Sequence, residues 1–521
     1  MESNLTDLAE ESTKGSFILV GGTVIATIIS AVASILVGRF LGPENYGIYS
    51  LSLVVPQIFF LITDFGIREG IIKFTIDARA KGQTNLGIKI IKYSLLIRTI
   101  AGIFSFLVLF VSADFVAEIL LNRPTLGFFI RIASVSIIFQ AIYSTSTYAY
   151  IGLDKAINCS IINQIQSLSK AIISILLIIL GFGIAGAVLG YIFGFITAGI
   201  IGASTLLLYF KKYDSSVDSE KVASTLKKLL KYGAPLYFSV LMLGFMPQFI
   251  DILLAFFSSN YDIGNFKATS NFMILLAIIA QQISTSLLPA FTKLNGASND
   301  QRNSFFNISH KYTTLVIIPL TVLLIIFSNE IVQFSYGSTY TDAGFFLAIY
   351  GFLYLLTGIG YLNLPSLFNG MGKTKETLKM NTITFLLVLT VSPLTTKFFG
   401  IIGAIMALLF AYTMGSIYGM YKAKRILGVT FNLNVLSKIY LIAFLSIIPS
   451  VLIVTDLMTI PKILLGGGIY LIVYITLVPL TKITTITEIE LLSQFMMKIK
   501  PLHILKPFIK YHNKILRLRE R

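Results

Sequence analysis

Long apolar runs recur along the whole chain, separated by short segments that contain charged residues, glycine or proline. A helix needs about 20 apolar residues to cross the hydrocarbon layer of a membrane, and each run reaches or approaches that length. We therefore expect an all-α integral membrane protein. Its fourteen predicted transmembrane helices lie at residues 16–38, 47–66, 90–112, 127–151, 158–180, 184–210, 232–257, 264–290, 310–329, 344–369, 377–397, 401–421, 437–455 and 463–481.

Lysine and arginine fall mostly in alternate connections between these runs. With the N-terminus in the cytoplasm, the cytoplasmic segments hold 33 of the 41 basic residues, the outer segments hold five, and three lie within helices. Basic connections are retained on the cytoplasmic side of a membrane. The distribution predicts cytoplasmic N- and C-termini in a multi-pass membrane protein. We expect its location to be the plasma membrane of a prokaryote.

The amino-acid composition excludes several classes of function. The chain is 55% hydrophobic and only 12% charged, whereas about a quarter of residues are charged in soluble domains, which excludes a water-soluble enzyme. The net charge of +17 belongs to the cytoplasmic segments, so we expect no nucleic-acid partner. One cysteine, Cys159, and three scattered histidines exclude a disulfide framework and predict no metal site.

The chain also repeats itself at a separation of about 217 residues. Each copy would contain six helices, so the copies share one orientation and are related by an axis along the membrane normal, around a central cavity. The matching stretches are Gly47–Tyr49 with Gly264–Phe266, Gly152–Lys155 with Gly370–Lys373, and Phe182–Ala187 with Phe399–Ala404.

This repeat predicts a domain organisation with two parallel six-helix bundles. The predicted parts are a cytoplasmic N-terminal segment (1–15), an N-terminal bundle (16–210), a basic cytoplasmic linker (211–231), a C-terminal bundle (232–421), helices 13 and 14 (437–481), and a basic amphipathic cytoplasmic tail (482–521). We expect the tail to lie on anionic membrane lipids, although a frayed basic tail accounts for its sequence equally well.

Three short stretches carry distinctive combinations of residues: GRFLGPENYGIY at Gly38–Tyr49, DFG at Asp64–Gly66 and NGMGKT at Asn369–Thr374. They resemble the polysaccharide biosynthesis family of lipid-linked oligosaccharide flippases. This family belongs to the multidrug/oligosaccharidyl-lipid/polysaccharide exporter superfamily. The resemblance implies alternating-access transport of a polyprenyl-linked oligosaccharide from the cytoplasmic to the outer leaflet. Gln248 departs from the family pattern, in which an arginine often precedes the aspartate that corresponds to Asp251.

Basic residues within the spans are the first candidates for binding a lipid phosphate, because an unpaired charge is costly in hydrocarbon. Lys170 lies about 18 Å into its helix at 1.5 Å per residue, nearest the midplane. Arg98 and Arg131 lie closer to helix ends, so their side chains could instead extend to lipid headgroups.

Polar side chains share faces of two neighbouring predicted helices. Asn163, Gln166 and Lys170 recur at helical spacing on one helix, and Gln140 and Tyr143 do so on the preceding one. We predict that they line the cavity and bind sugar hydroxyls. The alternative is that they hold helices together, as intramembrane amides and hydroxyls also do.

Acidic residues in or near the spans have different expected roles. Asp64 and Arg68 are four residues apart in the order that favours a helical ion pair, so we predict a structural lock or a gate there, with Arg39 as a further gate residue. Asp251 has no basic residue within four positions. It is a candidate for coupling to a proton or sodium ion, or for pairing with a cavity cation.

Two other functions compete with a flippase. A multidrug or cation antiporter of the same superfamily would need cavity carboxylates, whereas these spans hold more bases than acids. A membrane glycosyltransferase or polymerase would need grouped outer carboxylates, whereas the outer acids lie on separate loops. We therefore predict a transporter and not an enzyme, acting as a monomer, with glycan-assembly enzymes as candidate partners.

Overall fold

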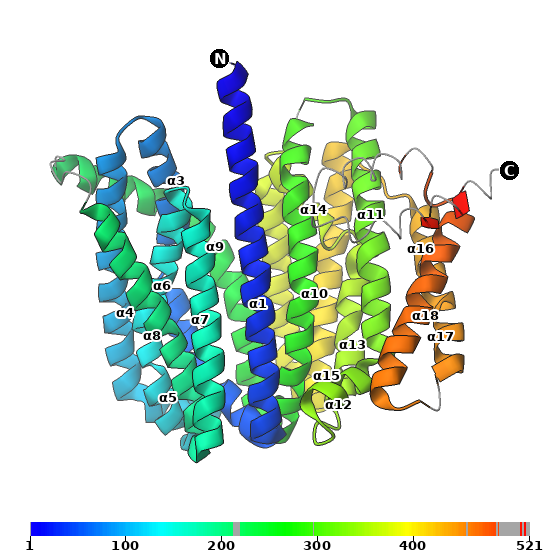
Figure 1. Cartoon of the computed structure of the whole chain (residues 1–521), viewed down its shortest axis with the longest axis horizontal. Coiled ribbons are helices and arrows are strands. Elements are labelled where there is room, and N and C mark those ends of the chain that lie inside the picture. Colours follow the sequence, from blue (N-terminus) through cyan, green and yellow to red (C-terminus); the bar gives the residue numbers. More distant parts are fainter. Residues whose placement is uncertain are drawn as a thin grey trace. The chain divides into compact units, whose positions relative to one another are not determined.

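A computed structural model describes residues 2–211, 219–294, 296–454 and 457–485, together with Glu488, Tyr511, His512, Ile515 and Leu516. Every regular element within the described residues is helical (Figure 1). The elements are α1 (Glu2–Ser52), α2 (Val54–Ile62), α3 (Ile67–Ala80), α4 (Thr84–Leu121), η1 (Pro124–Leu126), α5 (Gly127–Ala133), α6 (Val135–Gly152), α7 (Ala156–Leu177), η2 (Ile178–Phe182), α8 (Gly183–Phe210), α9 (Ser219–Phe257), α10 (Asn260–Lys293), α11 (Asn299–Ile326), α12 (Ser328–Tyr336), α13 (Ala343–Leu355), η3 (Leu356–Ile359), α14 (Asn363–Gly370), α15 (Thr374–Leu427), α16 (Leu433–Leu445), α17 (Ile447–Val454) and α18 (Thr459–Leu480).

Ten helical segments of the described chain are long and apolar enough to cross a membrane, or eleven if the bent pair formed by α13 and α14 is one span. Three of the ten are 44, 55 and 54 residues long, about twice the length that one crossing needs. Each covers all or most of two predicted spans, and Gly42, Gly183 or Gly400 interrupts it with a positive φ. The prediction of an all-helical membrane protein is confirmed, while the count of fourteen and the orientation stay predictions.

The chain forms two compact units. Unit 1 comprises residues 1–275, 338–342 and 381–408, and unit 2 comprises residues 276–337, 343–380 and 409–521. The predicted division into two six-helix bundles is a different, sequence-based one and stays a prediction. Residues 212–218 of the predicted linker and most of the predicted tail lie outside the described residues.

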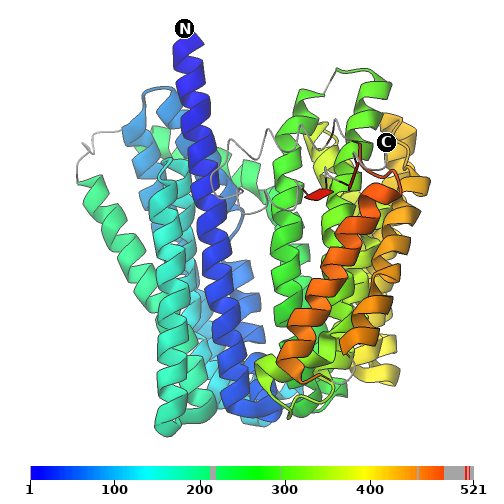
Figure 2. The ribbon, with the colours of Figure 1, turned by 45° about the vertical axis from the view of Figure 1, so that its right-hand side comes forward.

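In unit 1, α7 packs against both α1 and α8, and α6 packs against α4 and α8. A cluster of buried apolar side chains, including Ile71, Ile90 and Tyr150, joins α3, α4 and α6. In unit 2, α11 packs against α13, α16 and α18, around buried side chains that include Ile318 and Tyr470. Figure 2 shows α17 and α18 side by side in that unit.

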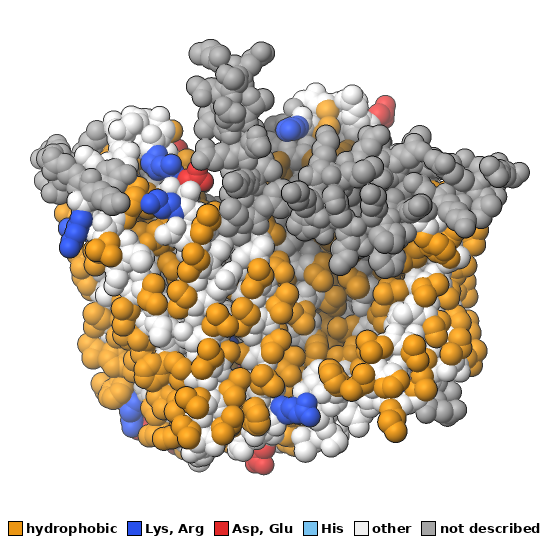
Figure 3. Space-filling view, viewed as in Figure 1, with side chains coloured by type: hydrophobic (Ala, Val, Ile, Leu, Met, Phe, Trp, Pro, Cys, Tyr) orange, Lys and Arg blue, Asp and Glu red, His pale blue; other side chains and the backbone are white. Residues whose placement is uncertain are grey.

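A stripe of exposed apolar side chains follows one face of α4. Its members recur at intervals of three or four residues, which is the spacing of one helix face. They are Leu96, Ile100, Phe104, Leu107, Val111, Phe115 and Ile119. Hydrophobic side chains likewise cover much of the molecular face drawn in Figure 3. Apolar surface of this extent is typical of a protein that contacts lipid.

The backbone repeats its local geometry at the offset that the sequence indicates. Gly183 has φ 50° and ψ −127°, and Gly400, 217 positions later, has φ 54° and ψ −132°. The turns that precede α7 and α15 also agree, because Lys155 N donates to Tyr150 O at 2.8 Å and Lys373 N donates to Phe368 O at 2.7 Å. Equivalent turns in the two halves therefore adopt equivalent backbone conformations.

Candidate functional site

A chain of hydrogen bonds joins four helices of unit 1 within the apolar spans. Gln140 of α6 donates to Ser136 Oγ at 3.0 Å and to the Tyr191 hydroxyl of α8 at 3.2 Å. The Tyr191 hydroxyl also hydrogen-bonds to Gln57 of α2. Gln57 Oε1 in turn accepts from Gln248 Nε2 of α9 at 2.8 Å. We call Gln57, Gln140, Tyr191 and Gln248 the glutamine–tyrosine network.

Lys170 lies beside this network. Its Nζ is 5.8 Å from the centroid of the Tyr191 ring, a cation–π distance. A Cβ on Gly194 of α8 would lie 2.8 Å from Lys170 Cβ, so a glycine at that position permits the close approach of α8 to α7. Lys170 is half-buried, and it has no carboxylate within 4.0 Å in the part of the chain that the structure describes.

The other predicted cavity residues of α6 and α7 bind one another or their own helix. The Tyr143 hydroxyl donates to Asn163 Oδ1 at 2.8 Å, which joins the two helices. Gln166 is buried and accepts from Ser167 Oγ at 3.4 Å. The Tyr143–Asn163 hydrogen bond thus joins α6 to α7, and the prediction that these residues line the cavity stays a prediction.

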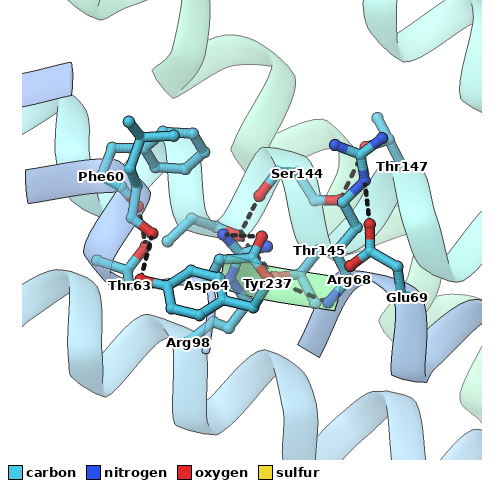
Figure 4. A network of polar contacts seen from close by, with 12 residues as sticks. Phe60, Thr63, Asp64, Arg68, Glu69, Arg98, Ser144, Thr145, Thr147 and Tyr237 are labelled. Carbon is cyan, nitrogen blue, oxygen red and sulfur yellow. Dashed lines mark hydrogen bonds and ion pairs between the residues drawn. The ribbon is translucent and has the colours of Figure 1, made fainter. Parts of the chain in front are cut away.

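Arg98 and Asp64 form an ion pair inside unit 1 (Figure 4). Arg98 Nη2 lies 3.4 Å from Asp64 Oδ2, and the Arg98 side chain is fully buried. The sequence predicted an ion pair between the Asp64 and Arg68 side chains. In the structure Arg68 contacts Asp64 through its backbone instead, because the Arg68 N–H donates to Asp64 Oδ1 at 3.3 Å. The helical rule fails here because Phe65 and Gly66 turn the chain with φ values of 48° and 77°.

The Arg68 side chain points to other partners. It pairs with Glu69 at 3.3 Å and lies 4.7 Å from the centroid of the Tyr148 ring. Burial raises the pKa of the Glu69 carboxyl, and the Arg68 guanidinium works in the opposite direction. Arg68 and Asp64 therefore belong to two neighbouring ion pairs, one on each side of the turn.

Arg131 and Arg39 lie apart from the glutamine–tyrosine network. Arg131 of α5 pairs with Asp114 of α4, and both side chains are partly exposed. Arg39 is exposed, close to the interruption of α1 at Gly42. The structure therefore gives neither residue a place beside Lys170.

Asp251 of α9 is buried and pairs with Lys267 of α10. The two residues are 16 positions apart, on the two arms of one helical hairpin. A search within four residues could not find this partner, because the hairpin and not the helix brings the two side chains together. In the described structure the Asp251 carboxylate thus pairs with Lys267, and coupling to a proton or sodium ion stays a prediction.

Sequence reasoning missed Tyr191 and Gln57, which link the predicted residue Gln140 to Gln248. Both lie in predicted spans, but a single polar residue among apolar ones has no partner that the sequence can identify. Among the described residues, no group of three His, Cys, Asp or Glu side chains lies close enough to hold a metal ion.

Comparison with known families identifies the chain. The family described as "Polysaccharide biosynthesis protein" matches residues 12–295, which is more than half of the sequence. The chain belongs to the polysaccharide biosynthesis protein family. It is thus a helical membrane protein of the superfamily that the sequence resemblance indicated.

Relatives of this polysaccharide biosynthesis protein extend the comparison. The lipid II flippase MurJ of Bacillus subtilis (strain 168) is 22% identical over 462 residues, with 81% of this chain and 84% of MurJ covered. A solved structure of MurJ in an inward closed conformation has a TM-score of 0.71 at 17% identity, covering 89% of this chain and 99% of that one. An inward-facing multidrug resistance MATE transporter has a TM-score of 0.65 at 16% identity, covering 77% and 94%. The polysaccharide biosynthesis protein therefore has the fold that these two classes of transporter share.

Proposed function

We propose that this protein is a flippase that moves a polyprenyl-linked oligosaccharide from the cytoplasmic to the outer leaflet, for cell-surface polysaccharide or glycoprotein assembly. Membership of the polysaccharide biosynthesis protein family supports this proposal. The similarity to a protein named as a lipid II flippase supports the lipid-linked class of substrate. One or two phosphates would join the polyprenyl chain to the glycan.

The unpaired charge of Lys170 carries the proposal. Arg98, Arg131 and Lys267 each have a carboxylate partner, whereas Lys170 has none within 4.0 Å among the described residues. An unpaired cation deep in a membrane protein is costly and usually marks a ligand pathway. A phosphate that binds Lys170 would supply the missing counter-charge. The charge-assisted hydrogen bond would also offset the free-energy cost of removing the phosphate from water.

The glutamine–tyrosine network gives the glycan its hydrogen-bonding partners. Its amides and hydroxyl carry both donors and acceptors, as sugar hydroxyls require. The aromatic rings of Tyr191 and Tyr143 both lie beside the Phe195 ring, with centroids 5.1 and 5.5 Å from it. These rings offer apolar faces on which sugar C–H groups can pack, next to the lysine that binds the phosphate.

Alternating access follows from the repeat. We infer fourteen crossings, because each of the three longest helical segments covers all or most of two predicted spans. We also infer that both termini lie in the cytoplasm of a prokaryotic cell. An even number of helices per copy keeps the copies parallel, which suits rocking about a central site. The protein would act as a monomer, with its basic tail on anionic lipid or beside glycan-assembly enzymes.

A drug or cation antiporter is the competing function, since MATE transporters share the fold. Such a protein would need a carboxylate that is free to bind a cation. Asp64 and Asp251 are instead paired with Arg98 and Lys267, which favours an anionic cargo. A coupling proton or sodium ion at Asp251 would have to compete with Lys267.

Translocation in proteoliposomes tests the proposal. The substrate is a fluorescent polyprenyl-diphosphate oligosaccharide, and its exposure in each leaflet is followed with and without a proton or sodium gradient. We expect the wild-type protein to translocate it and Lys170→Ala to fail, while Arg131→Gln, which alters an arginine outside the network, retains activity. No translocation by folded protein with several glycans would contradict the proposal, and efflux of a cationic dye would then favour the antiporter.

A further inference from the structure

Two contacts in unit 1 join the first half of the repeat to the second on the predicted outer side. Arg123, in the connection between α4 and η1, donates to Ala255 O at 3.3 and 3.2 Å, to Ser258 O at 2.6 Å and to Asn260 Oδ1 at 2.7 Å. Tyr340, in the connection between α12 and α13, donates to Gly38 O at 2.6 Å. Each side chain thus reaches from a connection in one half to the last helical turns before a bend in the other half.

These contacts are copies of each other. Tyr340 lies 217 positions after Arg123, and Ala255 lies 217 positions after Gly38. The donor in each half therefore binds the equivalent acceptor in the opposite half. The residue types differ, so a search for sequence identity between the halves does not detect the relationship.

A second pair of contacts obeys the same symmetry. A Cβ on Gly47 would overlap the carbonyl oxygen of Asn260, and a Cβ on Gly264 would overlap that of Pro43. Gly264 follows Gly47 by 217 positions, and Asn260 follows Pro43 by 217. Four reciprocal contacts at one offset are what a two-fold axis between the halves produces, and all of them lie on the predicted outer side.

We propose that Arg123 and Tyr340 form a twin outer latch, which holds the outer ends of the two halves together and releases both sides in the outward-open state. The proposal rests on the alternating access of the proposed function. Because the axis relates the two contacts, a rotation that separates one donor from its carbonyl separates the other as well. Opening the outer side therefore breaks both contacts in one movement.

The two contacts of the latch stabilise the closed outer side unequally. Arg123 is charged and makes four hydrogen bonds, whereas Tyr340 is neutral and donates one. Hydrogen bonds to charged groups stabilise more than neutral ones do. We expect Arg123→Gln to raise the ratio of outward-open to closed molecules about tenfold or more, and Tyr340→Phe to raise it about threefold.

Spin labels at Phe40 and Phe257 report on the latch. Both side chains are exposed, by 52% and 42%, and each lies two residues beyond a carbonyl that the latch binds. Labels at Phe40→Cys and Phe257→Cys in a Cys159→Ser background give the distance distribution by double electron–electron resonance. We expect a longer-distance population that grows from the otherwise native protein to Tyr340→Phe, Arg123→Gln and then the double variant.

Matched variants distinguish the loss of the latch contacts from a general loss of stability. Arg131→Gln removes an arginine whose partners, Asp114 and Phe110, lie in its own half. Tyr470→Phe removes a buried hydroxyl that has no hydrogen-bond partner in the described structure. Neither should alter the distribution. If Arg123→Gln is not recovered folded, Arg123→Lys and Tyr340→Phe carry the same test.

An unchanged distribution in the folded double variant, or equal changes in the matched variants, would overturn the latch. The measurement uses no transported lipid, so its outcome is separate from that of the translocation assay. A protein that translocates nothing but opens when Arg123 and Tyr340 are altered would retain the latch and lose the proposed substrate.

Discussion

Arg98 Nη2 lies 3.4 Å from Asp64 Oδ2, and the arginine side chain is fully buried. None of its three nitrogens makes a hydrogen bond to the described residues, so the Asp64 carboxylate is the main compensation for its charge. Removing one partner of a buried ion pair leaves the other charge uncompensated. The pair is therefore best regarded as one unit, whose two halves cannot be altered separately without a large loss of stability.

We expect Asp64→Asn to destabilise the protein by about 3–5 kcal/mol, because Arg98 would remain buried without a counter-charge. The double variant Asp64→Asn/Arg98→Met should recover much of this loss, since it leaves no buried charge. Thermal unfolding in detergent would measure both effects. Arg68→Gln is the control, because its pair with Glu69 is partly exposed and is worth about 1 kcal/mol or less. Equal losses of stability in Asp64→Asn and Arg68→Gln would contradict the prediction that the buried pair stabilises the protein more than the partly exposed one.

The fold was the more predictable part of this protein. Apolar runs depend only on local sequence, and they located the described helical segments that are long and apolar enough to cross a membrane. The orientation inferred from the basic residues stays a prediction. The repeat was also visible, because turns such as that at Lys155 and Lys373 need glycine or a left-handed residue at a fixed position.

Partner choice within the site was less predictable. Asp64 lies in a turn, so the helical spacing rule selected Arg68 where the fold places Arg98, which is 34 positions away. Asp251 found its partner across a hairpin, at Lys267. In both cases the tertiary arrangement of helices decides which charges meet, and periodicity along one helix carries no information about it.

Lys170 should tolerate arginine better than alanine. If its charge binds phosphate, Lys170→Ala loses translocation, while Lys170→Arg retains part of it because the guanidinium also binds phosphate. Initial rates in proteoliposomes, at several concentrations of the polyprenyl-diphosphate oligosaccharide, would separate weaker binding from slower transport. Equal activity in the two variants would remove Lys170 from the site, provided that both proteins are folded.

A cation that couples at Asp251 must displace Lys267 from the carboxylate. We expect Asp251→Asn to make translocation independent of proton and sodium gradients, because the amide takes up no proton near neutral pH and lacks the negative charge that attracts a sodium ion. Lys267→Met retains the carboxylate and should retain a dependence on one of the two gradients. Rates measured with each gradient in turn test this expectation.

The matched control for Asp251 is Glu330→Gln. Glu330 also pairs with a lysine, Lys462, at 2.6 Å, but it lies on the short helix α12 and not within a predicted cavity. Its substitution should leave the gradient response unchanged. Unchanged proton and sodium responses in Asp251→Asn would rule out coupling at this carboxylate and leave the ion pair with Lys267 as a structural contact.

The reciprocal glycines provide a test of the repeat that does not involve transport. Alanine at Gly47 or Gly264 would place a methyl group against a backbone carbonyl, of Asn260 or Pro43 respectively. Backbone cannot move aside as a flexible side chain can, so each substitution should destabilise the protein by about 1–3 kcal/mol. Because the two sites are equivalent, we expect similar losses from both.

Gly21→Ala is the control for these two substitutions, since nothing lies within 4 Å of a Cβ at that position of α1. An open helical site should gain about 0.5–1 kcal/mol from alanine, because glycine loses more conformational freedom on folding. Thermal unfolding of the three variants in one detergent compares them directly. A loss of stability in Gly47→Ala without a loss in Gly264→Ala would show that the two contacts are not equivalent. The glycine pair would then not support a two-fold axis between the halves.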